Sequence, residues 1–179
     1  TKNVIRKSFR DGYIAFSGML RCMGLCRTAN SKLLYSYKNK HKGQRCFLVG
    51  NGPSMRLSDL EGLQKNGEIT FGCNLVTKAF EQTTWRPDYY FLIDRICAKF
   101  QSEEINKAIG EIPLFTNITT YNIFREKPKN PVILYNIAKD KYKVKRSPLA
   151  YYIPSGSTVM SLMIEMAVYM GFSEIYLIG

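Results

Sequence analysis

Three polar side chains stand directly after predicted buried strands, and they have the clearest capacity for ligand binding or catalysis. They are Asn51, Asn74 and Asp94. Because the carboxyl ends of parallel strands meet at one edge of a sheet, we expect the three side chains to share one crevice. Asparagine amides can hydrogen-bond a ribose or a base. A carboxylate there can act as a general base, bind a sugar hydroxyl or hold a metal ion.

Each of these residues also has a structural alternative. Asparagine at a strand end is a common turn former, and aspartate there often caps a helix or forms an ion pair. Arg95 follows Asp94 directly and is a ready partner for such a pair. We favour a functional role for Asp94, because it is the only carboxylate at a predicted strand end. Both roles stay open for each asparagine.

The first candidate phosphate site is the turn within RCFLVGNGPS, residues 45–54. Gly50 and Gly52 permit backbone angles and close approaches that other residues do not, so the turn can present its N–H groups to a ligand. Ser54 adds a hydroxyl group. The turn is neither a GxGxxG motif nor a P-loop, because no Gly-Lys-Ser/Thr follows it. A purely structural turn is therefore an equal alternative.

A second candidate anion site is the turn of Ser155, Gly156 and Ser157, which precedes a predicted helix at 158–170. Two helix N-termini facing one crevice would suit a diphosphate or a nucleoside monophosphate. The sequence contains no DxD metal clamp, GxSxG elbow or HExxH pair. The single histidine, His41, falls in a polar stretch that we expect to be a solvated linker, so we do not expect it to be a catalytic base.

Buried strands alternate with helices from residue 45 onward, which predicts a Rossmann-like α/β domain with a mostly parallel sheet flanked by helices. Ser58 and Glu61 have the spacing of a capping box for the helix after the glycine turn. The last strand should insert at the centre of the sheet. The expected strands are 46–49, 69–73, 89–93, 112–115, 132–135 and 175–178, and the expected later helices are 75–80, 98–109 and 158–170.

The positive charge of the chain is concentrated near its beginning. Residues 1–45 hold 11 Lys and Arg against one acid, whereas the rest holds 15 against 13. A nucleic-acid-binding domain should not concentrate its charge this way. We therefore divide the chain into a basic helical leader and linker, residues 1–43, and a nucleotide-binding domain, residues 44–179. An apolar stripe in 4–27 predicts a helix that packs on this domain or another subunit, or lies on an anionic membrane.

The five cysteines give no sign of a disulfide framework or a zinc site, since their number is odd, no CxxC pair occurs and only one histidine is present. Cys46 and Cys73 fall inside predicted strands, where a free thiol behaves as a small apolar group. We expect a cytoplasmic protein, located at the inner face of the membrane if the leader binds lipid.

Residues 44–179 carry four motifs, in order, that are similar to those of known bacterial families. They are CFLVGNGPS, ITFGCN, DYYFLID and IPSGSTVMSLMIEMAVYMGFSEIYLIG. The segment resembles the motility-associated-factor and MptE-like glycosyltransferase family, which is named by similarity to flagellin glycosyltransferases and to archaeal 6-hydroxymethylpterin pyrophosphokinases. It is also similar to bacterial sialyltransferases that use CMP-sialic acid, which carry a GNGPS turn, a following CN pair and a late SG turn before a helix.

The resemblance to the sialyltransferases implies a set of donor-binding residues. These are Gly50, Asn51, Gly52, Ser54, Asn74, Ser155 and Gly156. The catalytic histidine of those enzymes lies beyond the final strand, so we expect further active-site elements after Gly179 and a C-terminally incomplete domain. Asp94 stands where the sialyltransferases have asparagine, which argues against sialic acid itself as the donor sugar.

These observations predict a glycosyltransferase that moves a CMP-activated acidic sugar from a nucleotide donor to a surface-glycan or glycoprotein acceptor. Helix N-termini and backbone N–H groups would stabilise the leaving phosphate, so we expect no metal or other cofactor, and Asp94 is the candidate base. One alternative is an ATP-dependent pterin pyrophosphokinase, in which Asp94 would bind Mg²⁺. Another is a non-catalytic nucleotide-binding module. A homo-oligomer stays open, and nucleic acid is not an expected partner.

Overall fold

The computed structural model describes residues 12, 16–20, 23–25, 28–134, 137–138, 153–154 and 158–179. Most of the helix expected at 4–27 lies outside the described residues, and so do Ser155, Gly156 and Ser157. Within the described part the chain forms an α/β fold, which confirms the predicted fold class.

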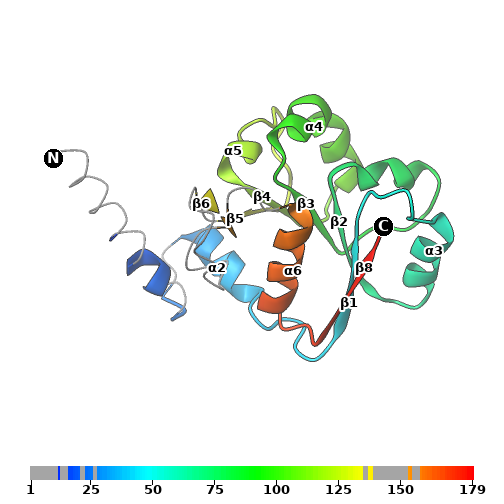
Figure 1. Ribbon diagram of the computed structural model, residues 1–179. Coiled ribbons are helices and arrows are strands. Elements are labelled where there is room, and N and C mark those ends of the chain that lie inside the picture. Colours follow the sequence, from blue (N-terminus) through cyan, green and yellow to red (C-terminus); the bar gives the residue numbers. More distant parts are fainter. Residues whose placement is uncertain are drawn as a thin grey trace.

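Six strands form one sheet, and every neighbouring pair of strands is parallel (Figure 1). Their order across the sheet is β5-β4-β3-β2-β1-β8. All residues of β3 and β4 are buried, as expected for strands of a parallel sheet that helices cover on both faces. The strands are β1 (Arg45–Val49), β2 (Ile69–Cys73), β3 (Tyr89–Leu92), β4 (Leu114–Asn117), β5 (Pro131–Leu134) and β8 (Glu174–Ile178).

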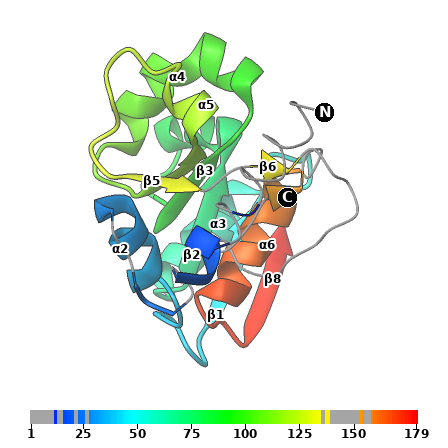
Figure 2. The same cartoon turned by 90° about the vertical axis from the view of Figure 1, so that its left-hand side faces the viewer.

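Helices cover both faces of this sheet, so the domain has three layers (Figures 1 and 2). One apolar core lies under α2 and α6, and a second lies under α3, the 3-10 helix η1 and α4. The burial of each large apolar side chain in these cores stabilises the folded state by about 1.5–3 kcal/mol. The helices are α2 (Ala29–Ser36), α3 (Leu57–Lys65), η1 (Asn74–Glu81), α4 (Arg95–Ile109), α5 (Ile118–Tyr121) and α6 (Val159–Tyr169).

Several local predictions need correction. Helix α4 begins at Arg95, three residues before its expected start, because Asp94 caps it. Strand β4 begins two residues later than expected. The capping box of Ser58 and Glu61 is wrong, since α3 already begins at Leu57 and Ser58 lies inside its first turn. A short parallel pair, β6 (Ile137–Ala138) with β7 (Ile153–Pro154), was not expected.

Helix α2 is part of the sheet domain, although we expected that domain to begin at residue 44. The Asn30 amide group donates to the Ile133 carbonyl at 2.8 Å and accepts from the Ile133 N–H at 2.9 Å. Leu34 is fully buried in the core under α6, and its carbonyl accepts a hydrogen bond from the Tyr169 hydroxyl at 3.0 Å. The basic segment before β1 therefore contributes to the core.

The turn that carries His41 is folded onto the sheet and is not a solvated linker. The Nε2 atom of His41 lies 2.7 Å from the Tyr89 hydroxyl, and its ring stacks on Phe172 with the ring centres 4.7 Å apart. The prediction of an exposed histidine is wrong, because these two contacts leave the ring half-buried. Tyr89 is the first residue of β3, so His41 lies at the amino-terminal edge of the sheet, opposite the carboxyl ends of the strands.

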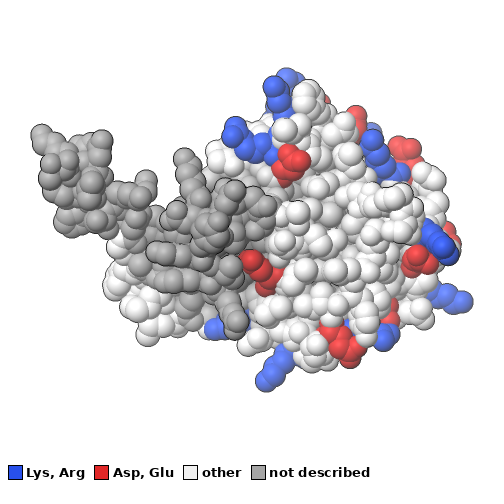
Figure 3. Space-filling model, in the orientation of Figure 1, with Lys and Arg blue, Asp and Glu red and all other residues white. Residues whose placement is uncertain are grey.

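Strand β8 lies at an edge of the described sheet and not at its centre, which corrects our expectation. It pairs with β1, and no other described strand lies on its outer side. Its Leu177 side chain is 60% exposed, and Val168 of the neighbouring face of α6 is 62% exposed. In Figure 3 the described surface over α6 and β8 carries few charged side chains.

A glycine in the middle of the sheet gives the first test of this packing. A Cβ atom on Gly72 would lie 2.9 Å from Val76 Cγ1 and 3.0 Å from Pro87 Cγ. We expect Gly72→Ala to lower the free energy of unfolding by about 1–3 kcal/mol through overpacking.

The matched control for this substitution is Gly62→Ala in α3, where an added Cβ meets nothing within 4 Å. It should raise the free energy of unfolding by about 0.4–1 kcal/mol, because alanine restricts the unfolded chain. Urea titrations measure both effects. Equal effects of the two substitutions would contradict the close packing around Gly72.

Candidate nucleotide-binding crevice

The crevice lies where the strand order reverses. From β1 the chain proceeds through β2, β3, β4 and β5 to one side, whereas β8 pairs with the other side of β1. In open α/β sheets such a switch point leaves room for a ligand beyond the carboxyl ends of the strands. The turn after β1 begins there, with the Gly50 N–H donating to the Ile178 carbonyl at 2.7 Å.

Gly52 allows the turn to approach the end of β8 closely. A Cβ atom at this position would lie 2.6 Å from the carbonyl carbon of Gly179, which no side chain can tolerate. Close backbone packing therefore requires a glycine here. A close approach of this kind is one of the reasons that we gave for glycine in this turn. This contact keeps the turn at the switch point.

Two helices begin near the turn. The methyl carbon of Met160, in the first turn of α6, would lie 3.3 Å from a Cβ on Gly50, so this end of α6 reaches the turn. Thr158 caps α6 by accepting from the Ser161 N–H at 3.3 Å. Helix α3 follows the turn and has no side-chain cap at Arg56. The arrangement agrees with the expectation of two helix N-termini near one crevice.

Asn51 links the turn to the neighbouring strand. Its Nδ2 atom donates to the Cys73 carbonyl at 3.1 Å and lies 3.6 Å from the Cys73 sulfur. The residue is exposed, so its side chain lies at the crevice surface. Asn51 thus has the structural role that we left open, and its nucleotide-binding role stays a prediction.

Asn74 has an unusual backbone and an unpaired side-chain atom. Its φ is +48°, a left-handed conformation that asparagine tolerates better than most residues. Its carbonyl accepts a hydrogen bond from the Tyr90 hydroxyl. Its buried Oδ1 atom has no hydrogen-bond partner among the described residues. An unpaired buried oxygen costs about 1–3 kcal/mol, so the conformation of Asn74 carries a cost in free energy.

Asp94 caps α4 and is exposed at the same edge of the sheet. Its Oδ1 atom accepts from the Ile96 N–H at 2.7 Å and from the Cys97 N–H at 3.3 Å. This is the structural alternative that we considered, and a catalytic role stays a prediction. Burial raises the pKa of the Cys97 thiol, the Asp94 carboxylate raises it further, and Lys78 opposes both. Asp94 and Lys78 thus both act on the Cys97 thiol.

The buried cysteines behave as small apolar residues, as predicted. Burial raises the pKa of Cys46 to about 12 and that of Cys73 to about 11. Both thiols are therefore protonated at neutral pH and are poor nucleophiles. Among the described residues, no group of three or more His, Cys, Asp or Glu is placed to hold a metal ion.

The structure brings Gly50, Gly52, Asn51 and Asn74 together around the ends of β1, β2 and β8. Ser54 lies exposed in the same turn. Sequence reasoning missed a hollow of about 440 Å³ that opens beside Asn51, between the start of α3 and η1. It also missed Lys78, which lines this hollow, because nothing in the pattern of η1 separates a lysine facing the site from a solvated one.

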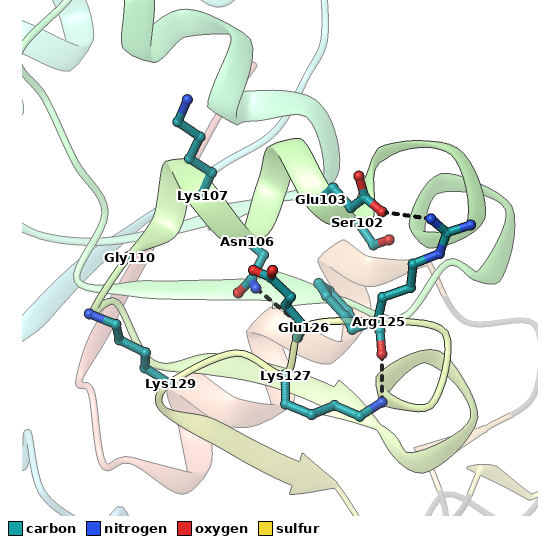
Figure 4. Close-up of a pocket in the computed structure, with 10 residues that line it drawn as sticks. Ser102, Glu103, Asn106, Lys107, Gly110, Arg125, Glu126, Lys127 and Lys129 are labelled. Carbon is teal, nitrogen blue, oxygen red and sulfur yellow. Dashed lines mark hydrogen bonds and ion pairs between the residues drawn. The ribbon is translucent and has the colours of Figure 1, made fainter.

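A larger hollow, of about 700 Å³, lies beside α4 and none of the predicted site residues lines it (Figure 4). Its walls come from the second half of α4 and from the loop before β5. Three of the cations there are already engaged, since Arg125 lies 3.4 Å from Glu103, the Lys127 ammonium donates to the Phe124 carbonyl at 2.6 Å and Lys129 pairs with Glu111. We therefore do not assign the nucleotide to this hollow.

A parallel α/β sheet with a glycine turn at its switch point defines a Rossmann-like protein with a candidate nucleotide crevice. Residues 25–179 match the family described as "6-hydroxymethylpterin diphosphokinase MptE-like", and the chain belongs to this MptE-like family. The predicted resemblance to this family is thereby confirmed. No curated protein matches the chain.

The fold is similar to that of a solved structure, the MAf glycosyltransferase from Magnetospirillum magneticum AMB-1. The two chains are 20% identical with a TM-score of 0.58, and the match covers 79% of this chain and 23% of that one. The chain thus spans about a quarter of the length of that protein. At this identity the similarity supports the fold alone.

The hydrogen bond of Asn51 gives a test of how the crevice is held together. Asn51→Ala removes the link to Cys73 and should lower the free energy of unfolding by about 0.5–1.5 kcal/mol. Asn51→Asp should cost more, because its carboxylate cannot donate and would face the Cys73 carbonyl. Thermal unfolding of both variants measures the difference. Wild-type stability of Asn51→Asp would contradict the role of this bond.

Proposed function

We propose that this protein is a glycosyltransferase that uses a nucleotide-activated sugar, with a CMP-activated acidic sugar as donor. The observation that carries the proposal is the glycine turn at the switch point of the sheet, held against Gly179 and flanked by the starts of α3 and α6. Backbone N–H groups and helix N-termini at one edge favour an anionic phosphate. Asn51 and Asn74 supply amide groups for the nucleoside or the sugar.

The chemistry requires a stabilised leaving phosphate and a base for the acceptor hydroxyl. The turn supplies fixed N–H donors, which act on developing negative charge without a metal ion. Asp94 is the candidate base, because it is an exposed carboxylate at the edge of the sheet that holds Asn51 and Asn74. Its cap bonds to α4 hold the carboxylate in place, and they use only Oδ1. A surface glycan or a glycoprotein would be the acceptor.

The alternative function is transfer of diphosphate from ATP to a pterin alcohol, and the description of the matching family favours it. In that reaction Mg²⁺ neutralises the transferred phosphates, and Asp94 would be a ligand of that ion. The same glycine turn would hold the phosphate chain. The two functions therefore differ in the nucleotide base and in the need for a metal.

The location that we propose is cytoplasmic, with contact to an anionic membrane through the basic residues of the leader, 1–43. Within the described ranges, no helix is both long enough and apolar enough to cross a bilayer. Contact at the membrane surface requires only positive charge and an apolar helix face. The exposed side chains of Val168 and Leu177 are candidates for a contact between subunits. Light scattering would detect such association, whereas liposome flotation would detect lipid binding.

A thermal-shift panel of CMP, CDP, UDP, GDP and ATP, each with and without Mg²⁺, tests the proposed function. We expect CMP to raise the melting temperature without metal, because the turn offers N–H groups to a single phosphate. Asn74→Gly should reduce this shift, since glycine removes the side chain but keeps the left-handed backbone. A response to ATP only in the presence of Mg²⁺ would favour the pyrophosphokinase instead.

The role of Asp94 can be separated from its role as a cap. Asparagine is as good an N-cap as aspartate, so Asp94→Asn should keep the melting temperature but abolish the base. We expect it to lower the sugar-transfer rate by about 10²–10⁴-fold. Asp94→Ala should in addition lower the free energy of unfolding by about 0.5–2 kcal/mol. Transfer by Asp94→Asn at the wild-type rate would exclude this carboxylate as the base.

A further inference from the structure

The hollow beside Asn51 is not yet assigned to any part of the ligand. It is lined by Asn51, Met55, Leu57, Leu75, Lys78, Ala79 and Gln82. Its volume of about 440 Å³ falls within the range of about 300–1,000 Å³ that is usual for small-molecule sites. Because Asn51 belongs both to the glycine turn and to the wall of the hollow, the two places adjoin.

The walls of the hollow suit a flat aromatic ring better than a sugar. Met55, Leu57, Leu75 and Ala79 present hydrocarbon, so the hydroxyl groups of a sugar ring would lose their partners there. The polar groups are few, namely the amides of Asn51 and Gln82 and the ammonium of Lys78. Apolar walls with a few placed polar groups are typical of sites that hold a heterocycle.

The ammonium group of Lys78 favours rings that carry a hydrogen-bond acceptor. It is exposed, no ion pair engages it in the described part of the chain, and no acidic side chain lines the hollow. An ammonium group donates hydrogen bonds and accepts none, so it requires an acceptor on the ring, such as a ring carbonyl. A pyrimidine with an exposed carbonyl oxygen meets this requirement.

We infer that the hollow between α3 and η1 binds the heterocyclic base of the nucleotide, an oxo-pyrimidine, while the phosphate lies at the glycine turn. This inference rests on the proposed function, because it takes a nucleotide in the crevice as given. It assigns Leu57 and Leu75 to the two sides of the ring and Lys78 to its carbonyl edge. Sequence patterns gave no ligand-binding role to any of these side chains.

The test compares CMP with ribose 5-phosphate, which has the same sugar and phosphate but no ring. In the wild-type chain with ¹³C-labelled methionine methyl groups, CMP should shift the Met55 signal through the ring current of the base. Ribose 5-phosphate should leave the Met55 signal in place but shift that of Met160, which lies near Gly50. A CMP-induced shift at Met160 without one at Met55 would overturn the inference.

A substitution that fills the hollow gives an independent measurement. Leu75→Trp should weaken CMP binding by about tenfold or more in isothermal titration and leave ribose 5-phosphate binding unchanged, because only the buried ring is displaced. The control is Leu33→Trp, which places the same side chain on the exposed surface of α2. Equal losses for both ligands, or no loss for either, would overturn the inference.

The proposed function fails in a different way. If neither CMP nor ribose 5-phosphate binds the wild-type chain, the phosphate site itself is absent and the proposed function falls with the inference. If both bind and Met55 does not respond, the phosphate site stands and only the assignment of the base is wrong.

Discussion

Parallel pairing of β1 with β2 on one side and with β8 on the other determines where a ligand can bind in this protein. The crossover connections leave in opposite directions from this point, which leaves a crevice at the ends of the two strands. The glycine turn occupies that gap, and Gly52 lets it lie against Gly179. Once this contact exists, Asn51 can reach Cys73, and the starts of α3 and α6 follow from the direction of the chain.

The polar residues of the crevice form hydrogen bonds within the fold, and some of their side-chain atoms form none. The Asn51 Nδ2 group donates to the end of β2, and one carboxylate oxygen of Asp94 accepts at the start of α4. Asn74 adopts a positive φ and keeps a buried oxygen without a partner among the described residues. Backbone strain and an unpaired polar atom at one residue are costs that folding alone does not explain, and such costs cluster at binding sites.

The function that we propose and its alternative place similar demands on this crevice. A sugar nucleotide and ATP both bring a phosphate group to a glycine turn near helix N-termini, so the turn cannot separate them. The difference lies at the two flanks. On one side lies the hollow beside η1, to which we assign the base, and on the other lies the carboxylate of Asp94, to which we assign either the proton or the metal ion.

The sequence by itself determined the alternation of strands and helices, the parallel sheet and the polar residues at strand ends, because these depend on local apolar patterns and on glycine. Only the tertiary structure decided features that depend on which elements become neighbours. Among the described strands β8 pairs with β1 alone, and His41 is half-buried through its contacts with Tyr89 and Phe172. The same holds for Lys78 and the hollow, since the walls of the hollow come from α3 and η1, which lie on different sides of β2 in the sequence.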